Sequence, residues 1–381
     1  MSYRVALLPE HFKWAGGLDF LRHILNGLIA VKASHNVSVI VAVEVSFLDT
    51  GLYRQFQDFI SHTGNNGIEQ ITYQAWNSDL AEVLLAHQID IILPVNADLG
   101  AHFPVPWVAY IPDFQHKYLF NNFSEQECFQ RETAFAARLR DCTAMLVNSA
   151  AVKNDITTFY PWINAERVSA LPYTPGPMPE WLALESKPVQ QKFGIDKAYF
   201  IMCNQFWLHK EHKTAIEAFA KLHDASLELV CTGTMEDYRD PGYIDSIKQL
   251  VATLKISTRV KFLGHVSKAE QIGLLKGARA LIQPTLFEGG PGGGAVYDAV
   301  ALDVPVIISD IAVNQEVNAR HLTFFEAGSV TGLADAMRNY SQPTVRLDDK
   351  ALIETGYANR EKLGLALIDI IEYTLSCYQA T

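Results

Sequence analysis

The sequence predicts an α/β protein made of two doubly wound parallel-sheet domains. Short apolar runs, typical of buried strands, alternate with segments of helical periodicity along the 381 residues. A segment dense in proline, at residues 171–188, interrupts this alternation near the middle of the chain. Since domains usually hold roughly 100–200 residues, a chain of this length is expected to form two.

In the first half, short runs made mostly of apolar residues predict parallel strands covered on both faces. They lie at residues 5–8, 37–45, 89–95, 107–111 and 143–148. The first run leads through Gly16 and Gly17 into a helix, because leucines recur at helical spacing from Leu18 to Leu28. Ser124 and Glu127 have capping-box spacing and predict the start of a later helix.

The second half repeats the alternation. Strands are predicted at residues 199–203, 227–232, 260–263, 280–284, 304–309 and 322–325. Helices are predicted at residues 210–223, 243–254, 268–278 and 330–340, the third behind a capping box of Ser267 and Glu270. We therefore expect an N-terminal domain (1–174), a proline-rich linker (175–189) and a C-terminal domain (190–362). A final helix (363–381) is expected to pack back on the N-terminal domain.

Composition excludes several classes of protein. The formal net charge of −11 disfavours a nucleic-acid binder, which usually carries a basic field. The five cysteines are scattered and form no Cys-x-x-Cys pair, so neither a disulfide framework nor a metal site is expected. The N-terminal apolar run is too short for a signal peptide, and no later run is long enough to span a membrane. We expect a cytoplasmic protein.

The most informative stretch is residues 284–310. A strand end is followed by Glu288 and then by a loop almost without side chains, made of Gly289, Gly290, Pro291, Gly292, Gly293 and Gly294. A helix carrying Asp298 and a further strand complete the unit. Such a loop lets backbone N–H groups approach an anion at a helix N-terminus. Because no Gly-Lys-Ser/Thr follows, it is not a P-loop. The flanking carboxylates favour a nucleotide-sugar site over a bare phosphate site.

These residues resemble the retaining glycosyltransferases of family 4. Phe287-Glu288-Gly289 matches the family's acidic pair, and residues 298–307 match its second acid and the following strand. Ser309-Asp310 and Glu316 match further, and the similarity is strongest over residues 199–340. The resemblance implies the GT-B architecture, with two Rossmann-like domains facing each other across a cleft. The acceptor would bind on the N-terminal domain and the donor on the C-terminal domain.

Two departures from the family pattern stand out. Nine residues separate Glu288 from Asp298, a longer spacing than the family has, and the second acid is Asp instead of Glu. The family's Gly-Arg pair before the loop lysine is replaced by Asn204 and Gln205, while Lys210 is kept. The donor diphosphate would therefore meet one cation fewer, because glutamine donates hydrogen bonds but carries no charge.

The resemblance also implies roles. Lys210 would meet the diphosphate, the glycine loop would offer N–H groups, and Glu288 would contact the donor sugar near its anomeric carbon. Asp298 would accept hydrogen bonds from ribose hydroxyls, while Gly264 and His265 would lie by the base. Gly16 and Gly17 match the family more weakly and are also expected among the residues that bind the donor nucleotide. His116, with Asp113, is the candidate for acceptor-side or catalytic proton handling.

Each role has a structural alternative. Lys210 could be a solvated lysine at a helix start, although a lysine is unfavourable at the positive end of the helix dipole. The glycine run could be an ordinary surface loop and Asp298 a surface helix residue. His116 could be a loop histidine that binds backbone.

The sequence thus favours a retaining, metal-independent glycosyltransferase that uses a nucleoside-diphosphate sugar as co-substrate and no cofactor. The expected acceptor is a glycan or lipid-linked glycan, in bacterial surface polysaccharide synthesis, with a peripheral contact at the inner face of the membrane. A nucleotide-sugar 2-epimerase of the same fold and a non-catalytic sugar-nucleotide or glycan-binding module stay open as alternatives.

Overall fold

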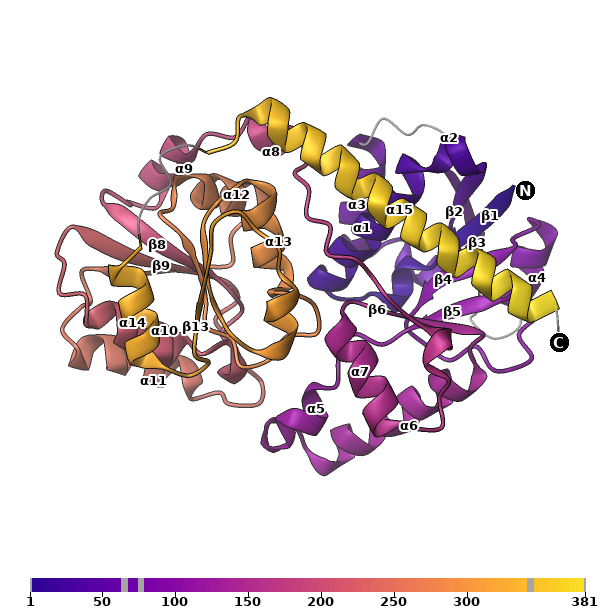
Figure 1. Ribbon diagram of the computed structural model, residues 1–381, viewed down its shortest axis with the longest axis horizontal. Coiled ribbons are helices and arrows are strands. Elements are labelled where there is room, and N and C mark those ends of the chain that lie inside the picture. Colours follow the sequence, from indigo (N-terminus) through magenta and orange to yellow (C-terminus); the bar gives the residue numbers. More distant parts are fainter. Residues whose placement is uncertain (1, 63–67, 75–78, 341–345, 380–381) are drawn as a thin grey trace. The chain divides into compact units, whose positions relative to one another are not determined.

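The computed structural model describes residues 2–62, 68–74, 79–340 and 346–379. Its contacts divide the chain into two compact units (Figure 1). The N-terminal unit comprises residues 1–172 and 358–381, and the C-terminal unit comprises residues 173–357. Each unit is built around its own parallel sheet, as the apolar runs predict.

Within the described residues, the N-terminal unit has a seven-stranded sheet in the order β3-β2-β1-β4-β5-β6-β7. The strands are β1 (Tyr3–Leu7), β2 (Val37–Glu44), β3 (Glu69–Tyr73), β4 (Ile91–Val95), β5 (Trp107–Tyr110), β6 (Ala144–Val147) and β7 (Val168–Ala170). Every neighbouring pair is parallel, so all strands end at one edge of the sheet.

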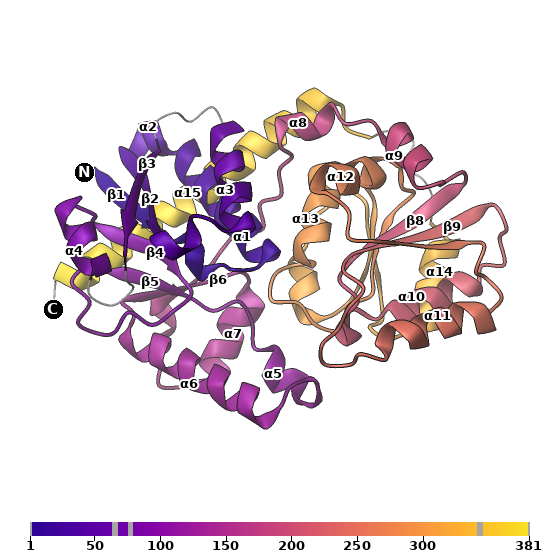
Figure 2. The same cartoon turned by 180° about the vertical axis from the view of Figure 1, so that it is seen from behind.

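Helices cover both faces of this sheet (Figures 1 and 2). On one face lie α1 (Ala15–Ala30), α3 (Gly51–His62) and the C-terminal helix α15 (Asp349–Gln379); on the other lie α4 (Asp79–Ala86), α6 (Glu125–Asp141) and α7 (Ala150–Phe159). Shorter helices are η1 (Pro9–His11), α2 (Lys32–His35), η2 (Val45–Phe47), α5 (Gln115–Tyr118), η3 (Phe120–Asn122) and η4 (Ala165–Arg167). The predicted capping box of Ser124 and Glu127 is present at the start of α6.

The C-terminal unit has a six-stranded parallel sheet in the order β10-β9-β8-β11-β12-β13 over the residues described. The strands are β8 (Ala198–Cys203), β9 (Leu227–Thr232), β10 (Val260–Gly264), β11 (Leu281–Gln283), β12 (Val306–Ser309) and β13 (Leu322–Phe325). The order reverses between β8 and β11. This is the doubly wound Rossmann order, whose ligands bind beyond the strand ends at the reversal.

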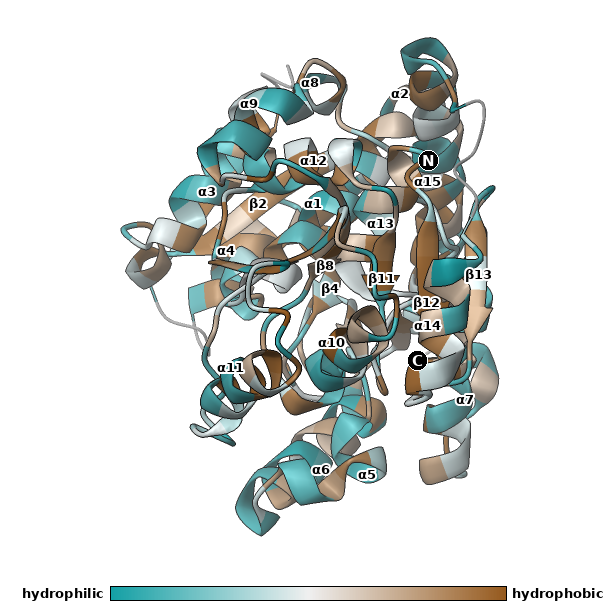
Figure 3. Cartoon of the chain, turned by 90° about the vertical axis from the view of Figure 1, so that its left-hand side faces the viewer, coloured by the Kyte–Doolittle hydropathy of each residue, from teal (hydrophilic) through white to brown (hydrophobic). Residues whose placement is uncertain are grey.

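Two layers of helices sandwich the second sheet. One holds α10 (His212–Ala220), α11 (Tyr243–Thr253) and α14 (Val330–Arg338); the other holds α9 (Ser186–Lys192), α12 (Lys268–Gly277) and α13 (Gly293–Ala301). Short elements are α8 (Pro179–Leu182), η5 (Leu208–Lys210) and η6 (Ala312–Glu316). In Figure 3 strands β11 to β13 are largely brown, whereas the surrounding helices also carry teal. The predicted capping box of Ser267 and Glu270 begins α12. Two Rossmann-like units of this kind make up a GT-B architecture, as predicted.

The segment expected to be a linker, residues 175–189, lies in the C-terminal unit and contains α8 and the start of α9. Pro179 is the first residue of α8, and Pro188 lies in the first turn of α9. Proline is tolerated there because the first N–H groups of a helix have no partner within it. Nζ of Lys276 donates to the carbonyls of Leu182 and Leu184, both at 2.6 Å, and so fixes this segment to α12.

Helix α15 begins before the residues expected for the final helix. Its residues 349–357 belong to the C-terminal unit and the rest to the N-terminal unit. Leu363, Leu367 and Ile371 are fully buried in the core beside α1 and α3. The helix backbones approach closely at Gly364 and Gly27, because a Cβ on Gly364 would lie 2.4 Å from the Gly27 carbonyl oxygen.

Candidate functional site

The candidate site lies at the carboxyl ends of β8 and β11, where the strand order of the C-terminal sheet reverses. The loop after β8 carries Asn204, Gln205 and Lys210, and the loop after β11 carries Glu288 and the glycine run. Strand pairing therefore brings together two segments that are about eighty positions apart in the sequence.

Lys210 and Glu288 form an ion pair. Nζ of Lys210 lies 2.5 Å from Oε1 of Glu288, and the side chains are 12% and 9% exposed. The two loops are also joined through backbone, because the carbonyl of His209 accepts the N–H of Leu286 at 2.8 Å and the hydroxyl of Thr285 at 3.2 Å. Lys210 is thus held over the loop after β11 and does not extend into solvent.

Gln283, the last residue of β11, connects the parts of the site and was not anticipated from the sequence. Its side chain is buried, and Nε2 donates to Oε1 of Glu288 at 3.0 Å and to the carbonyl of Gly292 at 2.8 Å. Its Oε1 accepts from Nδ2 of Asn204 at 2.6 Å. The signal available in the sequence was a lone amide inside an apolar strand, which must find hydrogen-bond partners when buried.

The glycine loop has a backbone that requires glycine at two positions. Gly292 and Gly293 have φ of +70° and +69°. A Cβ on Gly292 would lie 2.5 Å from the Val296 side chain, and one on Gly293 would lie 2.9 Å from Oε2 of Glu288. Gly292 is the N-cap of α13 and offers no side chain to its first N–H groups. The start of this helix can therefore accept an anion.

Asn314 in η6 holds the glycine loop in place through hydrogen bonds. The sequence did not predict this role. Its Oδ1 accepts the N–H of Gly292 at 3.0 Å, and its Nδ2 donates to the carbonyl of Ser309 at 2.9 Å. Gly290 closes a turn, since its carbonyl accepts the N–H of Gly293 at 3.2 Å. Gly294 is exposed, and a Cβ there would meet nothing within 4 Å. Gly289 is half-buried in the same loop.

Asp298 lies one and a half turns into α13 and is 5% exposed, so it is no surface residue. Nζ of Lys268 lies 2.5 Å from its Oδ2, and Nε2 of Gln271 donates to the same oxygen at 2.9 Å. Both partners are on the first turn of α12. The structure thus links Asp298 to α12, whereas it links Glu288 to the loop after β8.

The remaining predicted donor residues of the C-terminal unit lie at the same edge of its sheet. Asn204 is buried, and its N–H donates to the carbonyl of Thr232 at 3.1 Å, while Gln205 is exposed. Gly264 ends β10 with φ +68°, and its carbonyl accepts the N–H of Gly233 at 2.8 Å. His265 follows and is exposed.

His116 and Asp113 lie in the N-terminal unit, at and before α5. The His116 side chain is 1% exposed, and its Nε2 lies 2.5 Å from Oε1 of Glu132. Lys117 contacts the other oxygen of Glu132 at 2.7 Å. Burial lowers the pKa of His116, although Glu132 opposes the shift. Oδ1 of Asp113 accepts the N–H of Gln115 at 2.9 Å.

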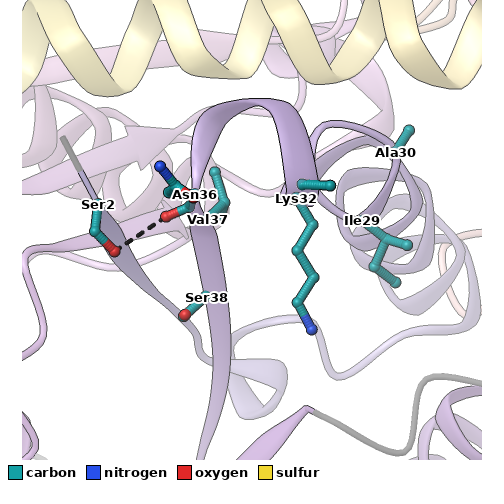
Figure 4. A pocket seen from close by; sticks show the side chains of 8 residues that line it. Ser2, Ile29, Ala30, Lys32, Asn36, Val37 and Ser38 are labelled. Atoms are coloured by element: carbon teal, nitrogen blue, oxygen red, sulfur yellow. Dashed lines mark hydrogen bonds between the residues drawn. The ribbon is translucent and has the colours of Figure 1, made fainter.

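Gly16 and Gly17 lie in the first turn of α1, in the N-terminal unit. The indole of Trp14 covers Gly17, where a Cβ would lie 2.6 Å from the ring. A shallow hollow of about 490 Å³ lies elsewhere in this unit, lined by Ser2, Lys32 and Asn36 among others (Figure 4). It is at the amino ends of β1 and β2, the edge opposite to that where doubly wound sheets bind ligands.

Within the described part of the chain, no group of three or more His, Cys, Asp and Glu side chains is placed to hold a metal ion. No described helix combines the length and apolar character needed to cross a bilayer.

Comparison with known proteins links the C-terminal unit to a family. Residues 185–356 match the family model described as glycosyl transferases group 1. The chain is 27% identical over 205 residues to the O-antigen chain mannosyltransferase RfbU of Salmonella typhimurium, an alignment that covers 54% of this chain and 52% of that protein. The chain thus spans about half the length of the curated relative it matches.

Solved structures share the whole fold at low identity. Anabaena HepE in complex with UDP and glucose superposes with a TM-score of 0.64 at 16% identity, covering 99% of each chain. A proposed UDP-N-acetylglucosamine 2-epimerase of Listeria monocytogenes superposes with a TM-score of 0.54 at 12% identity, covering 100% of this chain and 98% of that one. At such identities the likeness shows the two-domain fold alone.

Proposed function

We propose that this protein is a retaining glycosyltransferase that moves a sugar from a nucleoside-diphosphate sugar to a hydroxyl of a glycan or lipid-linked glycan. One observation carries the proposal. Lys210 and Glu288 form an ion pair where the strand order of a Rossmann sheet reverses, next to the start of α13, which begins at glycines and has no side-chain cap. The group 1 match of residues 185–356 supports it, since the match contains all of these residues.

Glycosyl transfer breaks the bond between the anomeric carbon and a phosphate oxygen. Positive charge develops on the sugar, and negative charge develops on the departing diphosphate. In the proposed mechanism Lys210 and the first N–H groups of α13 stabilise the diphosphate. Glu288 holds Lys210, and Gln283 and Asn314 hold Gly292 at the start of α13, so these groups need little reorganisation as the charge develops.

Glu288 has a second role in this mechanism. Its carboxylate is anchored by Lys210 and Gln283, next to the loop where the donor sugar would lie. A carboxylate beside the anomeric carbon favours the positive charge that develops there. In a retaining reaction the acceptor hydroxyl attacks from the side of the leaving group, so the departing phosphate oxygen can take up the acceptor proton.

The nucleoside would lie farther along the same edge. We assign Asp298 to the ribose hydroxyls, because a carboxylate can accept two hydrogen bonds. Lys268 offsets its charge and fixes its orientation. Gly264 and His265, at the end of β10, are assigned to the base.

On the N-terminal unit, His116 is proposed as a positioning residue of the acceptor side. Its ring is buried between α5 and α6, where it contacts Glu132 and Phe135. We therefore do not assign to it direct proton transfer to a bound sugar. Asp113 is half-buried and precedes α5, where it shapes the backbone of the acceptor-side loop.

We propose that neither a metal nor a cofactor takes part, because protein cations and helix N–H groups meet the diphosphate. The O-antigen relative supports the proposed acceptor class, and it suggests bacterial surface polysaccharide synthesis. Such an acceptor would place the protein in the cytoplasm at the inner face of the membrane.

A nucleotide-sugar 2-epimerase is the second candidate, because one solved structure of this fold is described as such an enzyme. Incubation with labelled UDP-, GDP-, ADP- and TDP-sugars, with and without membrane glycolipid extract, separates the candidates. Label transferred to glycolipid supports the proposal. Epimerised nucleotide sugar without transfer would replace it by the epimerase. Binding without either product would leave a binding module.

A further inference from the structure

The loop after β9 is built into the site next to the loop after β8. Strands β9 and β8 are neighbours, and the N–H of Phe206 donates to the carbonyl of Thr234 at 3.0 Å. Farther along, the N–H of Leu208 donates to Oδ2 of Asp237 at 3.2 Å. The loops after β9, β8 and β11 are therefore joined in that order, and Lys210 lies in the middle one.

Asp237 orients this outer loop. It is 4% exposed, and its second oxygen, Oδ1, accepts the N–H of Arg239 at 3.0 Å. One buried carboxylate thus joins the backbone two residues before Lys210 to the backbone of Arg239. The backbone of Arg239 is therefore held next to η5.

The guanidinium of Arg239 is directed over aromatic rings of both loops. Its Cζ lies 5.0 Å from the ring centroid of Tyr238 and 5.9 Å from that of Trp207. Trp207 in turn lies 5.6 Å from the ring of His209, the residue before Lys210. Burial lowers the pKa of His209, and the positive charges of Lys210 and Arg239 both add to the shift. Lys210 and Arg239 are therefore both close enough to His209 to lower the pKa of its imidazole.

We propose that Arg239 is a second diphosphate-binding cation that works with Lys210. This inference rests on the proposed function and extends it. The physical need arises because Glu288 offsets the charge of Lys210, while a bound nucleoside diphosphate carries at least two negative charges. A planar guanidinium suits phosphate oxygens because it can donate two parallel hydrogen bonds. Arg239 lies on the loop after β9, the neighbour of β8 on the side away from β11, a different place from Gln205.

The proposal predicts a selective loss of affinity. We would measure by titration calorimetry the dissociation constants of UDP, GDP and ADP, and of UMP, GMP and AMP, for the intact protein and its variants. For the best-bound base, Arg239→Gln should weaken the diphosphate about tenfold, as expected for one charged hydrogen-bonding group, and the monophosphate much less. Arg239→Lys should bind the diphosphate more tightly than Arg239→Gln, since lysine keeps the positive charge but cannot donate the two parallel hydrogen bonds of a guanidinium.

Two further variants separate this role from structural effects. Asp237→Asn should weaken the diphosphate in the same direction, because the Arg239 loop loses its charged anchor. Arg338→Gln is the matched control, since Arg338 is on α14 and pairs with Asp335 at the helix surface. Its affinities should equal those of the unchanged protein.

The outcomes are distinguishable. If no nucleoside diphosphate binds the unchanged protein, the proposed function and this inference both fail. If a diphosphate binds and Arg239→Gln binds it equally well, or loses diphosphate and monophosphate to the same extent, only the role of Arg239 is overturned. Should Arg239→Gln not fold, Arg239→Lys carries the test, with an expected loss of about threefold for the diphosphate.

Discussion

The ammonium group of Lys210 lies 2.5 Å from the carboxylate of Glu288, although 77 residues separate them in the sequence. Each residue comes from the first loop beyond one of the two strands that flank the reversal of the sheet. Because both side chains are nearly buried, neither charge is fully screened by water. A ligand that binds here would contact an ion pair that is already formed, next to the N-terminus of α13.

Removal of the Glu288 charge should impair turnover while the fold survives. Glu288→Gln keeps the side-chain size and a partner for Gln283, but it loses the charge that, in the proposed mechanism, favours the positive charge developing on the sugar. We expect the turnover number to fall about 10²- to 10³-fold, a typical loss for one electrostatic group in an active site. The midpoint of thermal unfolding should change by only a few degrees. Glu354→Gln, at an exposed glutamate of α15, is the control. Near-normal turnover in Glu288→Gln would refute the role.

Gln283 should contribute mainly to stability, through its partners. Gln283→Leu leaves Nδ2 of Asn204 and the carbonyl of Gly292 without their partner. Such unsatisfied buried groups cost about 2 kcal/mol of unfolding free energy, measurable by urea denaturation. In Asn204→Leu/Gln283→Leu both sides of one hydrogen bond are removed, so the double variant should lose less than the sum of the single losses. Strict additivity would show that the two amides do not interact.

Substitution by alanine should have different effects at two glycines of the same loop. Gly292→Ala introduces a methyl group against Val296 at a positive φ, and we expect a loss of about 2 kcal/mol in unfolding free energy. Gly294→Ala meets no atom within 4 Å and should leave stability unchanged. Its methyl group would project where the donor is proposed to bind, so donor affinity should fall. Unchanged affinity in Gly294→Ala would move the donor away from this turn.

Glu10 should make stability depend on pH. It follows β1, is 3% exposed and accepts the Tyr73 hydroxyl, and burial raises its pKa from 4.5 to about 7. The folded protein therefore holds a proton that the unfolded chain releases, so this contribution is complete below pH 4.5 and is lost as the pH rises through about 7.

Glu10→Gln removes this dependence. At pH 5 it should match the unchanged protein, and at pH 8 it should be more stable by about 2 kcal/mol in urea denaturation. Glu82→Gln, at an exposed position of α4, should show no such trend. A constant difference between pH 5 and pH 8 would mean that Glu10 does not titrate in this range.

The fold was largely predictable because buried parallel strands are continuous apolar runs. Strands β2, β4, β5, β6 and β9 all lie within predicted runs, and β1 and β8 begin one or two residues before theirs. Strand β3 was missed because it buries only Ile71 and Tyr73 and exposes the residues between and before them. Strand β7 has three residues, too few for a period to emerge. The sequence does not predict helices α8 and α9, because a segment dense in proline disfavours helix, whereas a single proline fits a first helical turn.

Local patterns predicted the part of the candidate site that one segment carries, and the family resemblance added residues on other loops, such as Lys210. The glycine loop and its flanking acids are contiguous, so their pattern can be read directly. The contact of Asn204 with Gln283 and that of Lys268 with Asp298 depend on how strands and helices pair, which no local pattern encodes. The same holds for Asp237, whose link to the loop of Lys210 follows from the order of β9 and β8.

The central claim is that the reversal point of the C-terminal sheet binds a nucleoside diphosphate through Lys210. Thermal unfolding of the protein with UDP, GDP, ADP, TDP and CMP, repeated with Lys210→Met, tests it most directly, because a ligand that binds only the folded state raises the midpoint. The exposed Lys213 on α10 supplies the control Lys213→Met. We predict that at least one diphosphate raises the midpoint of the unchanged protein and of Lys213→Met, but not that of Lys210→Met. Equal stabilisation of Lys210→Met, or no stabilisation by any of the five nucleotides, would contradict the account.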